Sequence, residues 1–308
     1  MEDFYFESQG QGRIHGCRWL PEGEIRAVVQ IVHGIAEYAE RYDDFARFLN
    51  RQGYLVVAED HMGHGKSIGE TGIQGYFHGG WFAAVADSYS LLERTRKEYP
   101  NVPYILMGHS MGSFMVRTIL EKYPDSGIAG CVICGTGWQP KALLSAGLLL
   151  CRLVCRIDGE TKPSPKLEKL VFGSYNKRVE QPKTAFDWLN RDEKAVAAYI
   201  ADPMCGFTAS AGLMRELLTG ISFIQKPENL ASMKKDLPVF FIAGGDDPVG
   251  AYGKGVEQAA DAFRKAGMAN VERKLYPKGR HEILNELNKQ EVYGDVAAWV
   301  QKVLSQRI

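Results

Sequence analysis

The sequence predicts an α/β protein with a mostly parallel central sheet, helices on both faces and a helical insertion. Short apolar runs alternate with segments of helical periodicity up to about residue 135, and the alternation resumes at about residue 237. Between these points the chain keeps helical periodicity, with prolines and charges, but no strand alternates with each helix. Strands that alternate with helices favour a parallel sheet covered on both faces.

Length and composition suit one large core plus an insertion. The chain has 308 residues, of which 45% are hydrophobic and 24% charged. Lys plus Arg and Asp plus Glu both number 37, so the formal net charge is zero. This balance gives no bulk electrostatic reason to expect nucleic acid or an anionic membrane surface as a partner.

The N-terminus and the cysteines predict a cytoplasmic protein. The first seven residues are acidic and lack the basic and then apolar pattern of a secretory signal. Most of the six cysteines lie in apolar stretches, which suits buried thiols in a reducing compartment. Cys131 and Cys134 have the spacing of a redox motif. They lie in a strand-like run rather than at a helix start, which disfavours thiol–disulfide chemistry.

The first half of the core begins with two short strands, at 4–7 and 14–20, which we expect to pair antiparallel across a Gly-Gln-Gly turn. The run at 27–32 is almost wholly apolar, as in a central strand buried on both faces. A helix follows, with Tyr42 to Leu49 supplying its apolar face and Gly53 its stop. The remaining elements expected here are a strand at 54–59, a helix at 81–99, a strand at 104–107, a helix resuming at 114–120 and a strand at 128–134.

In the second half of the core, the sequence predicts strands at 237–243 and 271–276 and helices at 256–266 and 290–304. We therefore divide the chain into a core, at 1–135 and 234–308, and a helical cap, at 136–233. An insertion at this point would cover the carboxyl ends of the strands, where such sheets bind their ligands.

The chain is organised around Gly108-His109-Ser110-Met111-Gly112, which joins an apolar strand to a helix. A glycine on each side lets the turn pack against its neighbours, where any side chain would collide. Such a turn lifts the serine hydroxyl above the sheet edge. The G-x-S-x-G pattern alone is weak, but a strand before it and a helix after it make Ser110 a candidate nucleophile.

A serine nucleophile needs a base to take its proton and a carboxylate to orient that base. In this type of sheet the acid and the histidine follow the serine, each in a loop after a strand. The loop after 237–243 offers two acids, Asp246 and Asp247, and the loop after 271–276 offers His281. Order, position and residue type therefore predict a triad that includes Ser110 and His281.

The remaining histidines are assigned structural roles. His109 is expected to support the turn rather than to act as a base. The loop that begins at His33 should supply the backbone N–H of Ile35, which pairs with the N–H of Met111 to form an oxyanion hole. His61 and His64 could suggest a metal beside Asp60, but the glycines between them fit a tight turn and no third ligand of suitable spacing follows. We expect no metal and no other cofactor.

These residues resemble the α/β-hydrolase superfamily, and more narrowly its monoacylglycerol lipase and lysophospholipase group, which is also described as serine aminopeptidase-like. The resemblance covers roughly residues 10–135 and 235–305. Three blocks carry it: His33-Gly34-Ile35-Ala36-Glu37 with Arg41-Tyr42, Asp60-His61-Met62-Gly63-His64-Gly65-Lys66-Ser67, and Gly108 to Gly112.

The resemblance implies an α/β-hydrolase fold and assigns site residues position by position. It implies Ser110 as nucleophile, His281 as base, and the N–H groups of Ile35 and Met111 as the oxyanion hole. The family's working aspartate stands just before a Pro-Val pair, which favours Asp247 over Asp246. One departure is Tyr38, where the family often has a histidine.

The leading function is a serine hydrolase that cleaves carboxylic esters of acylglycerols, lysophospholipids or similar acyl substrates through an acyl-enzyme. The alternatives are a peptidase or amidase on the same triad, or a non-catalytic binding protein. An aminopeptidase would need a carboxylate to hold the substrate amine, and the cap offers Glu160, Glu168 and Glu180.

Substrate selection is expected to lie in the cap, because the core supplies the same chemistry to any ester that reaches the serine. The apolar stretch 142–154 is too short for a membrane span. It could line an acyl tunnel through Leu143, Leu149 and Val154, make transient contact with a lipid surface, or pack on the core. Phe207 is a further candidate contact for the acyl chain, in a region that includes Leu213 and Leu217.

Overall fold

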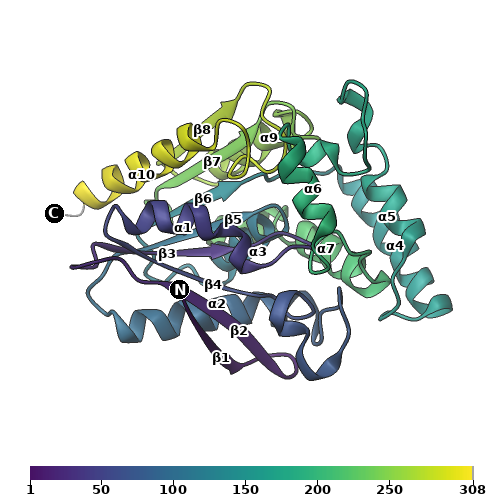
Figure 1. The fold of residues 1–308 in the computed structure, drawn as a ribbon, viewed down its shortest axis with the longest axis horizontal. Coiled ribbons are helices and arrows are strands. Elements are labelled where there is room, and N and C mark those ends of the chain that lie inside the picture. Colours follow the sequence, from purple (N-terminus) through teal and green to yellow (C-terminus); the bar gives the residue numbers. More distant parts are fainter. Residues whose placement is uncertain (307–308) are drawn as a thin grey trace.

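The computed structural model describes residues 1–306, and in this part of the chain eight strands form one twisted sheet (Figure 1). The strand order is β1-β2-β4-β3-β5-β6-β7-β8; β1–β2 and β2–β4 pair antiparallel, and every other neighbouring pair is parallel. The strands are β1 (Glu2–Glu7), β2 (Arg13–Trp19), β3 (Ala27–Val32), β4 (Tyr54–Glu59), β5 (Tyr104–His109), β6 (Gly130–Cys134), β7 (Val239–Gly244) and β8 (Val271–Tyr276).

Helices cover both faces of the sheet, and each face has its own apolar core. One core joins the sheet to α1 and α10, and the other joins it to α2, α3 and α9. The prediction of a mostly parallel sheet with helices on both faces is therefore confirmed. The bounds are α1 (Asp43–Asn50), α2 (Gly80–Glu98), α3 (Met111–Lys122), α9 (Lys254–Lys265) and α10 (Lys289–Ser305), with 3-10 helices η1 (Ala39–Tyr42) and η2 (Gly65–Thr71).

Most predicted element bounds agree with the structure to within two residues, and the differences have local causes. Strand β5 continues beyond Met107 because Gly108 still pairs with Val32 on one side and Ile133 on the other. Tyr42 belongs to a separate 3-10 turn, so α1 starts one residue later. Of the predicted core segment 234–308, residues 307–308 lie outside the described part of the chain.

The chain between β6 and β7 is helical and gathers at one end of the sheet, on the right in Figure 1. Helix α4 packs mainly on α7, which in turn contacts α2 and α3 of the core. The bounds are α4 (Lys141–Asp158), α5 (Pro165–Phe172), α6 (Glu193–Ala201), α7 (Ala211–Phe223) and α8 (Pro227–Ser232), with 3-10 helices η3 (Tyr175–Arg178) and η4 (Asp187–Leu189). Among residues 1–306, no helix is both long and apolar enough to cross a bilayer.

Candidate active site

Ser110 occupies a strained turn between β5 and α3. Its backbone angles, φ 54° and ψ −120°, are unusual for a residue with a side chain. A Cβ on Gly108 would collide with the carbonyl of Gly112, and one on Gly112 would collide with the carbonyl of Val32. The two glycines therefore let the turn close against β3, and the packing around the turn holds Ser110 in place.

A cavity of about 430 Å³ opens onto Ser110. Its floor comes from loops at the ends of the sheet strands, and the walls come from the segment between β6 and β7. The wall residues are largely apolar, and they include Pro165, Phe172, Phe186, Trp188, Leu189, Tyr199, Phe207 and Ala209. His281 lines the same cavity, so the two predicted reactive side chains share one space, and both are buried.

His281 is oriented by a buried carboxylate. Its Nδ1 lies 2.9 Å from Oδ2 of Asp247, and both side chains are almost fully buried. The other carboxylate oxygen of Asp247 accepts the Val249 N–H at 2.9 Å. A hydrogen on Nδ1 leaves Nε2 of His281 with a free lone pair, as a general base requires. Asp246, the other candidate acid, is exposed to solvent.

The two predicted oxyanion donors come from adjacent turns. Ile35 follows Gly34, where an added Cβ would lie 3.0 Å from Cβ of Ser110, so the backbone passes directly beside the serine. Met111 is the first residue of α3, and N–H groups at that end of a helix have no partner within the helix. Both N–H groups therefore belong to backbone that lies beside Ser110.

A buried ion-pair network links the Ile35 turn to the histidine loop. The Glu37 carboxylate accepts the Gly34 N–H at 2.6 Å, a proton of Arg41 at 2.7 Å and the Tyr42 hydroxyl at 2.9 Å. Arg41 also binds both oxygens of Glu282, the neighbour of His281, at 2.7 and 3.0 Å. Two parallel bonds of this kind fix geometry as well as charge.

His109 completes this network. Its Nδ1 lies 3.0 Å from Glu37, and its Nε2 donates to the carbonyl of His281 at 3.2 Å. Burial alone would lower the pKa of His109, but the hydrogen bond and charge of Glu37 raise it. Burial alone would likewise raise the pKa of Glu37, but His109 and Arg41 hold it well below its usual range. His109 thus fits the predicted supporting role.

The segment 187–190 is hydrogen-bonded directly to the histidine loop. The Arg280 guanidinium donates to the carbonyls of Asp187 and Asn190, at 2.7 and 2.9 Å. The Glu282 N–H donates to the Leu189 carbonyl at 2.8 Å. This segment therefore holds the loop as well as walling the cavity.

The buried side chains of His33, His61 and His64 pack on one another. The rings of His33 and His61 lie 3.8 Å apart between centroids, and the ring of His64 contacts Phe207. Burial lowers the pKa of His61 to about 3 and that of His64 to about 4. With these lowered pKa values the rings of His61 and His64 are neutral at pH 7, and they pack against His33 and Phe207.

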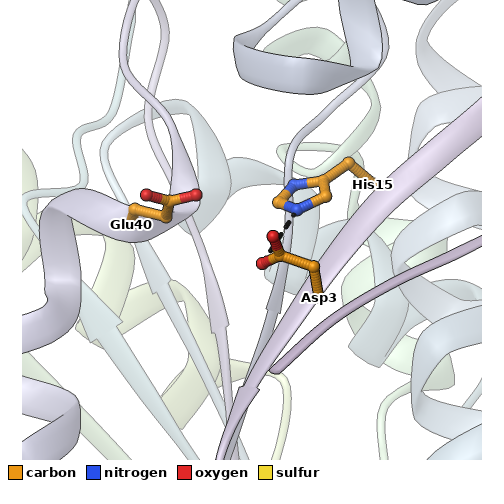
Figure 2. A group of neighbouring side chains, drawn as sticks. All are labelled: Asp3, His15 and Glu40. Carbon is orange, nitrogen blue, oxygen red and sulfur yellow. Dashed lines mark ion pairs between the residues drawn. The ribbon is translucent and has the colours of Figure 1, made fainter. Parts of the chain in front are cut away.

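A separate group of acidic and imidazole side chains lies at the N-terminal edge of the sheet (Figure 2). Asp3, His15 and Glu40 bring one atom each to within 4.8 Å of one another. Lys66 forms ion pairs with Asp3 at 3.2 Å and with Glu40 at 2.6 Å. The Lys66 ammonium supplies the positive charge between these two carboxylates. We therefore interpret the group as an ion-pair network rather than a metal site.

The four residues considered as substrate contacts do not all lie at the cavity. Phe207 lines the cavity, whereas Leu143, Leu149 and Val154 are not among the residues that line it. Helix α4 buries Leu144 and Cys151, so its opposite side faces solvent, where Leu143 is 60% and Leu149 70% exposed.

Several residues of the site were not singled out from the sequence. Glu37 and Arg41 appeared only as part of a matching block, and Glu282 had only its position beside His281 to indicate it. No local sequence pattern indicated that Trp188, Tyr199 and the other wall residues line the cavity. Their position depends on how the segment between β6 and β7 packs over the sheet.

Comparison with known proteins places the chain among ester hydrolases. A family model described as serine aminopeptidase, S33, matches residues 23–288. A monoacylglycerol lipase of Mycolicibacterium smegmatis is 30% identical over 96% of this chain and 95% of its own length. The human monoglyceride lipase is 26% identical over 90% of this chain and 86% of its own. The crystal structure of a thermostable carboxyl esterase from Bacillus coagulans, in complex with glycerol, superposes with a TM-score of 0.91 at 28% identity, covering 98% of both chains. The predicted α/β-hydrolase fold is thereby confirmed.

Proposed function

This chain belongs to the family described as serine aminopeptidase, S33, and from that premise we propose that it hydrolyses monoacylglycerols through an acyl-enzyme on Ser110. It is a serine carboxylic-ester hydrolase, as the relatives and the esterase fold indicate. One observation carries the proposal: a largely apolar cavity opens onto Ser110 and also contains His281, which is paired with buried Asp247.

In the proposed mechanism, Oγ of Ser110 attacks the ester carbonyl while Nε2 of His281 takes its proton. The negative oxygen of the tetrahedral intermediate accepts hydrogen bonds from the N–H groups of Ile35 and Met111. The C–O bond to glycerol then breaks, and His281 returns the proton to the leaving oxygen. Water, activated by the same histidine, hydrolyses the acyl-enzyme and releases the fatty acid. Asp247 stabilises the imidazolium in each half-reaction.

The cavity wall favours an acyl chain over a peptide amine. A hydrocarbon chain gains about 0.8 kcal/mol for each methylene that it buries against such a surface. Of the three cap carboxylates considered as amine anchors, Glu168 alone is among the cavity residues, and it accepts the Thr208 hydroxyl at 2.7 Å. Glu160 instead pairs with Tyr76 and Arg215.

We expect kcat/KM on p-nitrophenyl esters to rise about fourfold per methylene until the cavity is filled, and then to fall. Ala185→Trp should move this maximum to shorter chains, because Ala185 is exposed at the cavity wall, where a larger side chain can be accommodated without disturbing the core. The measurement is a chain-length profile from acetate upwards.

The matched control for that profile is Ala142→Trp, which adds the same bulk at an exposed site on α4 outside the cavity. An unchanged maximum in Ala185→Trp would place the acyl chain elsewhere. Aminoacyl nitroanilides that react faster than every ester would favour the peptidase alternative.

The outer side of α4 is proposed to make transient contact with lipid surfaces. Its exposed apolar side chains form one stripe along the helix, most of them three or four residues apart. We call this surface the apolar stripe; it comprises Leu143, Leu149, Leu150, Leu153 and Ile157. Exposed Lys141, Arg152 and Arg156 border it on the same helix. An apolar strip with a basic border suits the interface of an anionic lipid layer.

Leu149→Glu combined with Leu153→Glu should weaken binding to vesicles of anionic phospholipid by at least tenfold, because two leucines no longer bury apolar area and two repelled charges are added. Activity on a dissolved p-nitrophenyl ester should stay within about twofold, since neither residue lines the cavity. Co-sedimentation with vesicles gives the binding. Equal vesicle binding by wild type and variant would show that the apolar stripe does not mediate contact with lipid.

A cytoplasmic location is also proposed. In the described part of the chain the cysteines are unpaired thiols, and all except Cys155 are buried. Unpaired cysteines of this kind suit a reducing compartment.

A further inference from the structure

The oxyanion turn is held from outside the core by a tyrosine of the cap. The carbonyl of Ala36, the residue after Ile35, accepts the Tyr199 hydroxyl at 2.9 Å and the Gly206 N–H at 3.0 Å. Tyr199 lies on α6 and Gly206 lies in the loop that follows it. Two hydrogen bonds from an insertion thus converge on one backbone carbonyl beside Ser110.

This carbonyl belongs to a strained residue. Ala36 has φ +54°, in the left-handed region that residues with a side chain rarely adopt. Such a conformation persists only where its surroundings hold it. On the N-terminal side of Ile35 the backbone is held too, because the Gly34 N–H donates to the Glu37 carboxylate at 2.6 Å. The N–H of Ile35 therefore lies between two fixed backbone groups, one of which the cap fixes.

Tyr199 is itself firmly placed. The residue is 7% exposed, and its ring carries the Arg41 guanidinium over its face at 4.8 Å. The ring of Phe186 packs against it at 5.4 Å. Burial raises the pKa of the Tyr199 hydroxyl well above its ordinary value, so the group remains a donor across the working pH range.

We propose that Tyr199 is a positioning residue for ester hydrolysis: its hydroxyl holds the Ala36 carbonyl so that the Ile35 N–H stays aimed at the oxyanion. The inference rests on the proposed role of Ile35 in the oxyanion hole. It makes the cap part of the catalytic geometry as well as the wall of the substrate cavity.

Tyr199→Phe isolates the proposed effect because it removes one hydroxyl and keeps the ring. An oxyanion donor that is entirely lost costs 10²–10³ in turnover, and a misaligned one should cost less. We expect kcat to fall about tenfold and KM to change by less than about twofold. The affinity for a trifluoromethyl ketone, which forms a tetrahedral oxyanion on the serine, should fall by about the same factor as kcat.

Tyr38→Phe is the matched control. The Tyr38 hydroxyl donates to Asp202, the C-terminal cap of α6, at 2.8 Å, so this variant also removes one hydrogen bond between core and cap. It leaves the Ala36 carbonyl untouched. Its kcat and inhibitor affinity should stay within about twofold of wild type, and thermal unfolding should show similar losses of stability in the two variants.

Equal kinetic effects in Tyr199→Phe and Tyr38→Phe would overturn the proposal, and so would a change in KM alone. A wild-type kcat for Tyr199→Phe would overturn it as well. Ser110→Ala is measured alongside: if that variant keeps its activity, the proposed function itself fails. An inactive Ser110→Ala with no specific effect at Tyr199 refutes only the positioning role.

Discussion

Ser110→Ala is expected to reduce turnover of p-nitrophenyl esters by about a millionfold while leaving the fold intact. The substitution removes a single hydroxyl from a turn whose backbone is held by the close packing of Gly108 and Gly112. Without that oxygen the proposed acyl-enzyme cannot form, although the proposed oxyanion donors and the cavity remain. Steady-state kinetics and the thermal unfolding midpoint measure the two halves of this prediction.

A fluorophosphonate probe gives the matching chemical test of Ser110. It should modify wild type at Ser110 and leave Ser110→Ala unmodified, as mapped by peptide mass spectrometry. Ser113 is a useful internal control, because it lies one turn along the same helix and donates its hydroxyl to the Ser110 carbonyl at 2.6 Å. Equal modification of Ser113 or any other serine would contradict the assignment of the nucleophile.

Asp247→Asn is expected to lower kcat by about four orders of magnitude. The carboxylate accepts from Nδ1 of His281 at 2.9 Å and so keeps Nε2 free to act as a base. An amide in the same place can present its N–H₂ group to the ring, which favours the tautomer with its hydrogen on Nε2. The measurement is kcat over a range of pH, so that a shifted optimum is not mistaken for lost activity.

The neighbouring acid provides the control for Asp247. Asp246 is exposed, so Asp246→Asn should change kcat by less than about threefold. If Asp246→Asn proved the more damaging of the two, His281 would have to take Asp246 as its partner in solution, and the loop would need a different conformation.

The core could be predicted well from the sequence because its signals are local. The strands at 27–32, 54–59 and 271–276 coincide with β3, β4 and β8. A near-continuous apolar run predicts that the first of them is buried on both faces, and it is. The turn at Ser110 could be recognised because its two glycines, its strand and its helix are all adjacent in the chain.

The candidate acid could be predicted only in part from the sequence. Local sequence offered Asp246 and Asp247 equally, and only the resemblance to a family favoured the second. The structure shows the physical difference between them: one side chain turns inward to His281 and the other turns to solvent. That difference arises from the packing of two loops that are 34 residues apart in the chain.

The cap was the least predictable part, because its role depends on which side of each helix meets the core. The apolar stretch at 142–154 has a buried side, through Leu144 and Cys151, and an exposed side, through Leu143 and Leu149. Hydrophobicity alone could not separate the two. Tyr199 likewise gives no signal in the sequence, since its partner carbonyl belongs to a residue 163 positions earlier.

The most direct test of the proposed function follows one turnover of a monoacylglycerol by rapid quenching and mass spectrometry. The expected result is transient acylation of the peptide that carries Ser110, with glycerol released first and the fatty acid released as the adduct decays. Hydrolysis without any adduct on this peptide, or an adduct on another residue that decays at the rate of turnover, would contradict the proposed mechanism.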